Sequence, residues 1–317
     1  MAIVDVKEII ESGVHFGHRV SRWHPKMAPY IFGKRNLIHI IDVRETLKGI
    51  VRASNFLTQL AATGKDVVFV GTKRQAKALI QRAAEDCGMH WVSERWLGGT
   101  LTNFHTVRSR LKRLEELEAL EETGAIEKYS KKQVSRWRRE RRKIQRNLEG
   151  LRRMKSLPGC LFVIDIRREH ISVREARKCG IPVVALVDTD CDPREADIVI
   201  PGNDDAYRSI QIILGIVQQS IKAGRESHAK MLAEQEKARI EEERRKEDEA
   251  AKARAAREAA AAAASAQAAQ SAAKVAQPVA PAAATPAPKA GSPPTTGPRA
   301  GAAESAGAPL PAASADS

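Results

Sequence analysis

The feature that most constrains the fold is a series of short apolar segments that alternate with amphipathic, helix-forming segments. The apolar segments are residues 66–71, 160–166, 182–188 and 197–201, and the helical ones are residues 72–87, 169–179 and 204–223. Apolar runs without polar alternation are typical of strands buried on both faces, and strands that alternate with helices pair in parallel. The sequence therefore predicts a three-layer, doubly wound α/β fold built on a parallel sheet. Periodicity does not determine the order of the strands.

Residues 103–155 interrupt this alternation with two helical segments, separated by Gly124, a residue typical of a helix stop. Each segment carries apolar residues at helical spacing on one face. These residues are Phe104, Val107, Leu111 and Leu114 in the first segment and Val134, Trp137, Ile144, Leu148 and Leu151 in the second. The pattern predicts an antiparallel helical hairpin inserted into the α/β body.

The second arm of this hairpin is strongly basic. Residues 128–155 contain thirteen Lys and Arg against two acidic residues, a balance of +11 in a chain whose formal net charge is +14. Uncompensated like charge destabilises a helix, and a polyanion supplies the compensation. The alternative is a solvated helix face, which fits the first arm, where glutamates offset the basic residues. The second arm is better explained by nucleic-acid contact.

Composition changes sharply after residue 224, because every Trp, Tyr, Phe and Cys precedes that position. Residues 225–259 are rich in Ala and balanced charges, which favours a solvent-exposed helix. Residues 260–317 are dominated by Ala, Pro, Ser and Gly, which predicts disorder. The predicted organisation is an α/β body of residues 1–102 and 156–224, a hairpin of residues 103–155, a charged helical extension and a disordered tail.

The excess of positive charge indicates an anionic partner, either nucleic acid or a membrane surface. No apolar run approaches the roughly 20 residues of a membrane span. The first residues are acidic where a signal peptide is basic. The four cysteines form no CxxC pair, which favours buried thiols in a reducing compartment. We therefore expect a cytoplasmic protein with no membrane partner.

Two segments of the body add basic residues that suit a phosphate ligand. Lys73 and Arg74 follow the first buried strand at a helix N-terminus, where free N–H groups favour phosphate. An ordinary βα turn with solvated bases explains them equally well. Residues 19–30 interleave bases with Trp23 and Tyr30, which suits backbone contacts and base stacking. Packing of these aromatic residues onto the body is the alternative, and both can hold together.

The sequence offers little support for catalysis, a cofactor or a metal. The loop of residues 71–75 lacks the glycine spacing of a nucleotide-binding P-loop, so a nucleotide-binding enzyme or regulator is only the alternative function. Asp188, Asp190 and Asp192 lack the central Gly and final Glu of a calcium loop. Spacing does not decide whether His15, His18, Asp188 and Asp205 meet at a metal. We expect no catalytic residues, no cofactor and no metal.

Ordered motifs along residues 3–224 resemble the bacterial family of the second protein of the small ribosomal subunit. The motifs are residues 13–18 (GVHFGH), 23–27 (WHPKM), 31–33 (IFG), 69–73 (FVGTK), 95–104 (RWLGGTLTNF), 157–158 (LP), 162–165 (FVID), 180–182 (GIP), 188–193 (DTDCDP), 200–206 (IPGNDDA) and 208–210 (RSI). In this series Asp190 stands where the family has Asn, which adds an acid and disfavours RNA contact at that loop. Nothing from the resemblance extends to the chain after residue 224.

The resemblance implies a flavodoxin-like body with a helical-hairpin insertion and no enzymatic activity. It implies binding to 16S ribosomal RNA near the junction of head and body, together with recruitment of the large multi-OB-fold protein of the small subunit and contact with other ribosomal proteins. With RNA as the ligand, we expect contacts from residues of three regions. They are Arg19, Arg22, Trp23, Lys26, Lys73, Arg74, Arg95, Lys131, Lys132, Arg136, Arg138, Arg139, Arg142 and Lys143.

Overall fold

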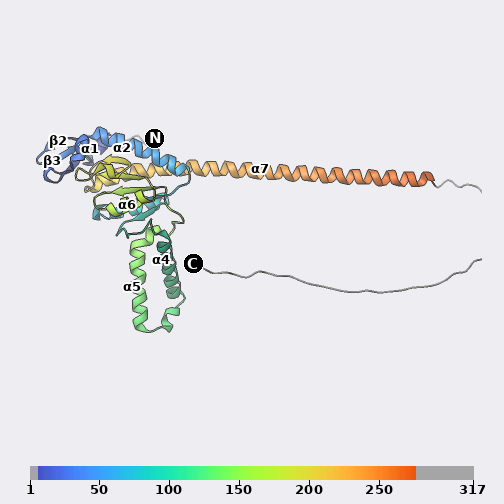
Figure 1. The fold of residues 1–317 in the computed structure, drawn as a ribbon, viewed down its shortest axis with the longest axis horizontal. Coiled ribbons are helices and arrows are strands. Elements are labelled where there is room, and N and C mark those ends of the chain that lie inside the picture. The colour runs from blue at the N-terminus through green and yellow to red at the C-terminus, as the bar shows by residue number, and fades with distance from the viewer. Residues whose placement is uncertain (1–5, 276–317) are drawn as a thin grey trace, which may run out of the picture. The chain divides into compact units, whose positions relative to one another are not determined.

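The computed structural model describes residues 6–275 of the chain (Figure 1). The chain divides into two compact units, residues 1–245 and 246–317. The first unit contains both sheets and the helices that cover them. None of its helices, nor any other in the described part of the chain, is long and apolar enough to cross a membrane.

The core of the first unit is a five-stranded parallel sheet. Its strands, in spatial order, are β5 (His90–Val92), β4 (Val67–Val70), β6 (Cys160–Ile164), β7 (Val183–Val187) and β8 (Ile198–Pro201). Every neighbouring pair is parallel. Numbered along the chain, the order is 2-1-3-4-5, which is the flavodoxin-like arrangement. The predicted α/β fold with a parallel sheet is confirmed.

Helices cover both faces of this sheet. Successive side chains of a strand point to opposite faces, so the continuous apolar strands make both faces apolar. Phe69 and Phe162 pack with α2 (Val43–Ala62), α3 (Arg74–Cys87) and the start of α7 (Tyr207–Val275). Their strand neighbours pack on the other face with α6 (His170–Lys178) and the base of the helix pair described next. All residues of β4, β6 and β7 are buried, which explains their continuous apolar sequences.

A helix pair lies between β5 and β6 in the sequence, formed by α4 (Phe104–Glu122) and α5 (Lys131–Leu148). A 3-10 turn, η3 (Ala125–Lys128), joins the two helices, and Figure 1 shows them side by side, extending away from the sheet. The two helices pack against each other through the apolar faces that the helical spacing predicts. A second turn, η4 (Glu149–Leu151), returns the chain to the body, where a Cβ on Gly150 would lie 2.1 Å from the Trp91 carbonyl oxygen. Only glycine fits this close approach.

The N-terminal region contains a small antiparallel sheet that the sequence revealed only in part. After α1 (Val6–Glu11), its strands β1 (Phe16–Arg19), β2 (Ile31–Arg35) and β3 (Ile38–Ile41) pair in the order β1-β3-β2. The sequence pattern predicts a short helix over residues 5–12 and one strand over residues 36–42, with little periodicity in the segment between them. The strands are short and both pairings contain register irregularities. The sequence therefore shows no clear alternation of apolar and polar residues in this region. Two 3-10 helices, η1 (Val20–Arg22) and η2 (Pro25–Tyr30), connect β1 to β2.

The last helix, α7, begins at Tyr207, three residues after the predicted start, and continues to Val275. Its apolar face is buried against the sheet as far as Ile221, and beyond His228 every side chain that the structure describes is exposed. The disordered tail was predicted from residue 260, whereas residues 260–275 are helical. The rest of the predicted tail, residues 276–317, lies outside the described residues.

The segment before α4 is held by one buried carboxylate on α6. Glu175 accepts hydrogen bonds from the backbone N–H groups of Gly99 (2.7 Å) and Leu101 (2.9 Å) and from the indole of Trp96 (3.3 Å). The residue is only 7% exposed. A buried carboxylate with several donors organises a loop that has no regular secondary structure.

Replacing Glu175 with Ala should destabilise the body by about 3 kcal/mol, because several buried donors lose their acceptor. Urea unfolding followed by tryptophan fluorescence measures this loss. Lys178→Ala, at an exposed position on the same helix, is the control and should change stability by less than about 0.5 kcal/mol. Equal stabilities for the two variants would contradict the assigned role of Glu175.

Candidate functional site

The loops that follow β4, β6, β7 and β8 meet at the carboxyl edge of the parallel sheet, where ligands bind in this architecture. They bring five carboxylates together, which we call the acid cluster: Asp165, Asp188, Asp190, Asp204 and Asp205. Three basic side chains contact the cluster: Lys73 from the loop after β4, His18 from β1 and Arg167 from the loop after β6. The residues lie far apart in sequence, so only the fold assembles them.

Lys73 pairs with three members of the cluster. Its Nζ lies 2.7 Å from Asp204 Oδ1, 2.9 Å from Asp205 Oδ1 and 3.1 Å from Asp165 Oδ2, and its side chain is 12% exposed. Burial lowers the pKa of Lys73, but the charges and hydrogen bonds of these carboxylates outweigh burial and raise the pKa above its ordinary value. Lys73 is therefore an internal cation. This corrects the expectation that it offers a free charge to phosphate.

His18 lies against the opposite side of the cluster. Its Nδ1 is 3.0 Å from Asp188 Oδ2, and its Nε2 is 3.3 Å from Asp205 Oδ2. Contact with the Asp188 carboxylate raises the pKa of His18 to about 9, against burial that lowers it. The backbone fixes this position, because His18 N donates to Thr189 Oγ1 (2.8 Å) and His24 N donates to the Thr189 carbonyl (2.7 Å).

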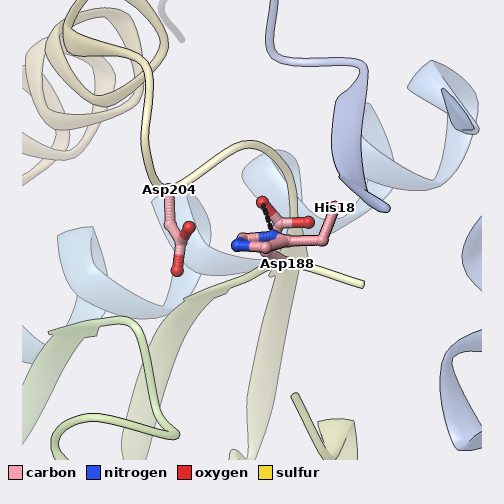
Figure 2. A group of neighbouring side chains, drawn as sticks. All are labelled: His18, Asp188 and Asp204. Atoms are coloured by element: carbon pink, nitrogen blue, oxygen red, sulfur yellow. Dashed lines mark ion pairs between the residues drawn. The ribbon is translucent and has the colours of Figure 1, made fainter. Parts of the chain in front are cut away.

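Asp204 is the most buried member of the cluster, with no exposed surface. Burial, and then the neighbouring Asp188 carboxylate, raise its pKa well above the ordinary value. Figure 2 shows the carboxylate facing the ring of His18 and Asp188. One candidate ligand atom from each of these three residues lies within 4.8 Å of the others. His15, named with this group in the sequence, packs against Phe16 instead (ring centroids 4.1 Å apart).

A cleft of about 1060 Å³ opens above the acid cluster. The N-terminal segment forms one wall with Arg22, Trp23 and His24. The loop after β6 forms the other wall. Arg167 in that loop pairs with Asp190 at 3.0 Å, and Arg168 donates to Thr72 Oγ1 at 2.8 Å.

Sequence reasoning missed the wall of residues 165–170. A signal was available, because these residues directly follow a buried strand and so must lie at the same edge as Lys73.

The other predicted residues of the body lie on the surface. Arg19, Arg22, Arg74 and Arg95 are exposed, and Trp23 is 38% exposed with its ring near that of His39. Lys26 pairs with Asp192 at 2.5 Å, so its charge is partly compensated. Arg19, Arg22, Trp23 and Lys26 thus form an exposed N-terminal segment beside the cleft, whereas Arg74 and Arg95 line no part of it.

The second candidate surface is the outer face of α5. All seven predicted RNA-binding residues of α5 are exposed, while Trp137, Arg141 and Ile144 face α4 and are less exposed. Arg138 pairs with Glu121 at 3.3 Å, and Arg141 with the same carboxylate at 2.6 Å. Within the described part of the chain, the remaining six have no acidic partner within 4.0 Å. They are Lys131, Lys132, Arg136, Arg139, Arg142 and Lys143.

The α5 surface includes a shallow groove of about 510 Å³, lined by Lys132, Arg136, Arg139 and Trp137 among others. Trp137 is fixed in place, because Tyr129 packs edge-on against it (4.8 Å between centroids) and Arg113 lies over its ring at 6.0 Å. No residue lines both this groove and the cleft above the acid cluster. The predicted residues of α5 and those of the N-terminal segment therefore belong to two separate surfaces, and Arg74 and Arg95 line neither hollow.

Comparison with known proteins identifies the family. The profile of the family described as Ribosomal protein S2 matches residues 9–224. The chain is 57% identical over 225 residues to the small ribosomal subunit protein uS2 of Rhodopirellula baltica, an alignment that covers 71% of this chain and 86% of the relative. It is 51% identical over 234 residues to the protein of the same name from Koribacter versatilis, covering 74% and 78% of the two chains. The matched region contains the sheet, the acid cluster and the helix pair, and on this basis the chain belongs to the ribosomal protein S2 family.

Proposed function

We propose that this chain binds 16S ribosomal RNA through the exposed basic face of α5, assisted by the N-terminal segment beside the cleft. Membership of the family makes the chain a structural component of the small ribosomal subunit, located in the cytoplasm and acting in translation. It is not an enzyme. The nucleotide-binding enzyme weighed from the sequence is therefore rejected, and the pairing of Lys73 with three carboxylates agrees with that rejection.

One observation carries this proposal: the α5 surface displays six basic side chains without acidic partners among the described residues. Such a helix repels itself in isolation, and the phosphates of a nucleic acid relieve this repulsion while releasing counterions. The α4 side of the pair compensates α5 at the seam through Glu121, and its Glu118 pairs with Arg152 after the end of α5. The outward charge remains available to a partner.

The N-terminal segment suits a different kind of contact. Trp23 offers a partly exposed aromatic ring, and Arg19 and Arg22 flank it with exposed guanidinium groups. Aromatic and guanidinium planes stack on unpaired bases, while the charges contact phosphates. The α/β body would then set the separation of the two RNA-binding surfaces.

Within the subunit we place this chain at the junction of head and body, beside other ribosomal proteins. We also propose that it helps to recruit the large multi-OB-fold protein of the small subunit. The support for both statements is the family relationship. The division into a body of residues 1–102 and 156–224 and an inserted hairpin of residues 103–155 belongs to the same proposal. The structure qualifies the insertion, since Val107, Leu148 and Leu151 at the base of the pair are buried with the sheet residues.

Changing Arg139, Arg142 and Lys143 together to Gln should make RNA affinity less dependent on salt. Each lost phosphate contact reduces the slope of log affinity against log salt by about 0.7 to 0.9, so the triple change should reduce the slope by roughly 2 to 3. Filter binding to 16S rRNA over a series of KCl concentrations measures it. Arg244, Arg245 and Lys246 to Gln removes the same charge from α7 and is the control. Equal slopes for the α5 variant and the unaltered protein would exclude α5 as the RNA contact.

Lys73→Met separates the structural role of Lys73 from a phosphate-binding role. Because the change leaves buried carboxylates without their cation, it should destabilise the body by about 3 to 5 kcal/mol. The salt slope of RNA binding should stay unchanged below the unfolding transition. Lys77→Met is the matched control, since the pair of Lys77 with Glu94 (2.8 Å) is substantially exposed. A stable Lys73→Met protein with a shallower slope would restore Lys73 as an RNA contact.

A further inference from the structure

The groove on the α5 surface combines an aromatic ring with basic side chains. Trp137 lines the groove together with Lys132, Arg136 and Arg139. Positively charged grooves that contain aromatic side chains bind single-stranded nucleic acid, because bases stack on the rings while the charges contact phosphates. The alternative is a tryptophan that only packs between the two helices, flanked by solvated bases. The shape and the chemistry of the groove distinguish these two roles.

The groove is large enough for a small ligand and leaves aromatic surface open to it. Its volume of about 510 Å³ lies within the usual range of ligand pockets, roughly 300 to 1,000 Å³. Trp137 is only partly buried although it faces α4, and its neighbour Tyr129 is 45% exposed. Packing between α4 and α5 therefore leaves part of the Trp137 indole in contact with solvent, at the wall of a hollow.

Two neighbours hold the indole of Trp137 in one orientation. Tyr129 packs edge-on against it, with 4.8 Å between the ring centroids, and the Arg113 guanidinium lies over the ring at 6.0 Å. Arg113 is itself held, because it pairs with Glu116 at 2.8 Å. A ring that is already ordered loses little conformational entropy when a ligand binds, which favours stacking of a planar group on it.

The remaining side chains of the groove suit the edge of a base. Gln133 offers an amide that donates and accepts hydrogen bonds, and Glu140 offers a carboxylate that accepts them. Unpaired bases expose donors and acceptors on their Watson–Crick edges to side chains of this kind. A phosphate group alone would be repelled by Glu140. The groove is therefore better matched to a whole nucleotide than to an isolated anion.

We propose that this groove binds one unpaired nucleotide of RNA, with its base against Trp137 and the adjoining phosphates on Lys132, Arg136 and Arg139. The inference rests on the proposed contact of α5 with RNA and adds a second kind of interaction to it. Charge alone holds a paired or an unpaired strand. A stacked base makes α5 favour RNA at a loop, a bulge or a single-stranded junction, because extracting a base from a duplex costs unstacking energy.

Trp137→Leu tests the inference, since leucine keeps this face of α5 apolar and removes the aromatic ring. Fluorescence anisotropy measures the binding of full-length protein to a labelled single-stranded RNA and to a duplex RNA of the same length. The variant should bind the single strand at least about 5-fold more weakly, which corresponds to about 1 kcal/mol, the lower end of the range for stacking one base. Its affinity for the duplex and its salt slope should both stay unchanged.

Two further variants separate stacking from helix packing. Trp137→Phe keeps an aromatic face, so it should retain most of the affinity for the single strand. Val134→Ala removes apolar area from the same face of α5, and Val134 does not line the groove, so this variant should change neither affinity. Circular dichroism and urea unfolding of each variant show whether the helix pair remains folded.

Two results would overturn the inference. One is an unchanged affinity of Trp137→Leu for the single strand. If that variant also failed to join small subunits, the groove would be assigned to a protein partner. The other is an equal loss of affinity for single strand and duplex, which would give Trp137 a packing role only. Neither result affects the contact of α5 with RNA, which the salt slope of the Arg139, Arg142 and Lys143 variant tests separately.

If Trp137→Leu does not fold, crosslinking of the unaltered protein decides the question. A single-stranded RNA that carries thiouridine is irradiated in the complex, and mass spectrometry assigns the crosslinked residues. Crosslinks to Trp137 support the groove as a nucleotide site. Crosslinks confined to other residues of α5 would overturn the inference and leave the charge contact in place.

Discussion

The ion pairs of Lys73 with Asp165, Asp204 and Asp205 are the contacts on which the functional end of the molecule depends. They tie the loops after β4, β6 and β8 to one another at the carboxyl edge of the sheet. His18 extends this network to β1, and Thr189 fixes the backbone of the N-terminal segment against the end of β7. An edge that holds ligands in many α/β proteins is here occupied by the protein's own charges. We propose that this edge positions the neighbouring N-terminal segment and is not itself the RNA-binding surface.

Charge is therefore divided between two places with different tasks. Negative charge gathers at the sheet edge, where buried partners compensate most of it. Positive charge gathers on α5, where compensation stops at the seam with α4. The helix pair can present such a surface without destabilising the core. Only its base, with Leu148 and Leu151, is buried against the sheet, and the charged part of α5 lies outside the core. Membership of the ribosomal protein S2 family agrees with this separation of a scaffold from a basic surface.

The sequence predicted those features that depend on local patterns. Strands buried on both faces leave continuous apolar runs, so the parallel sheet could be recognised, and helical spacing identified which residues of α5 face outward. The antiparallel sheet was recognised only in part because its strands are short and irregular. The interpretation of Lys73 failed for another reason. Its partners Asp204 and Asp205 follow it by more than 130 residues, and local context cannot show that a base is already paired. For the same reason the sequence left open whether His18 meets Asp188, and it gave no sign of Asp204 beside them.

The central claim is that RNA contacts α5 and the N-terminal segment but not the sheet edge. Ultraviolet crosslinking of the protein in intact small subunits, with mass-spectrometric assignment of the crosslinked residues, tests it most directly. The account predicts crosslinks to 16S rRNA within residues 131–143 and 19–26, and none at Lys73. Crosslinks at Lys73 or confined to α7 beyond residue 224, with α5 unmodified, would contradict it.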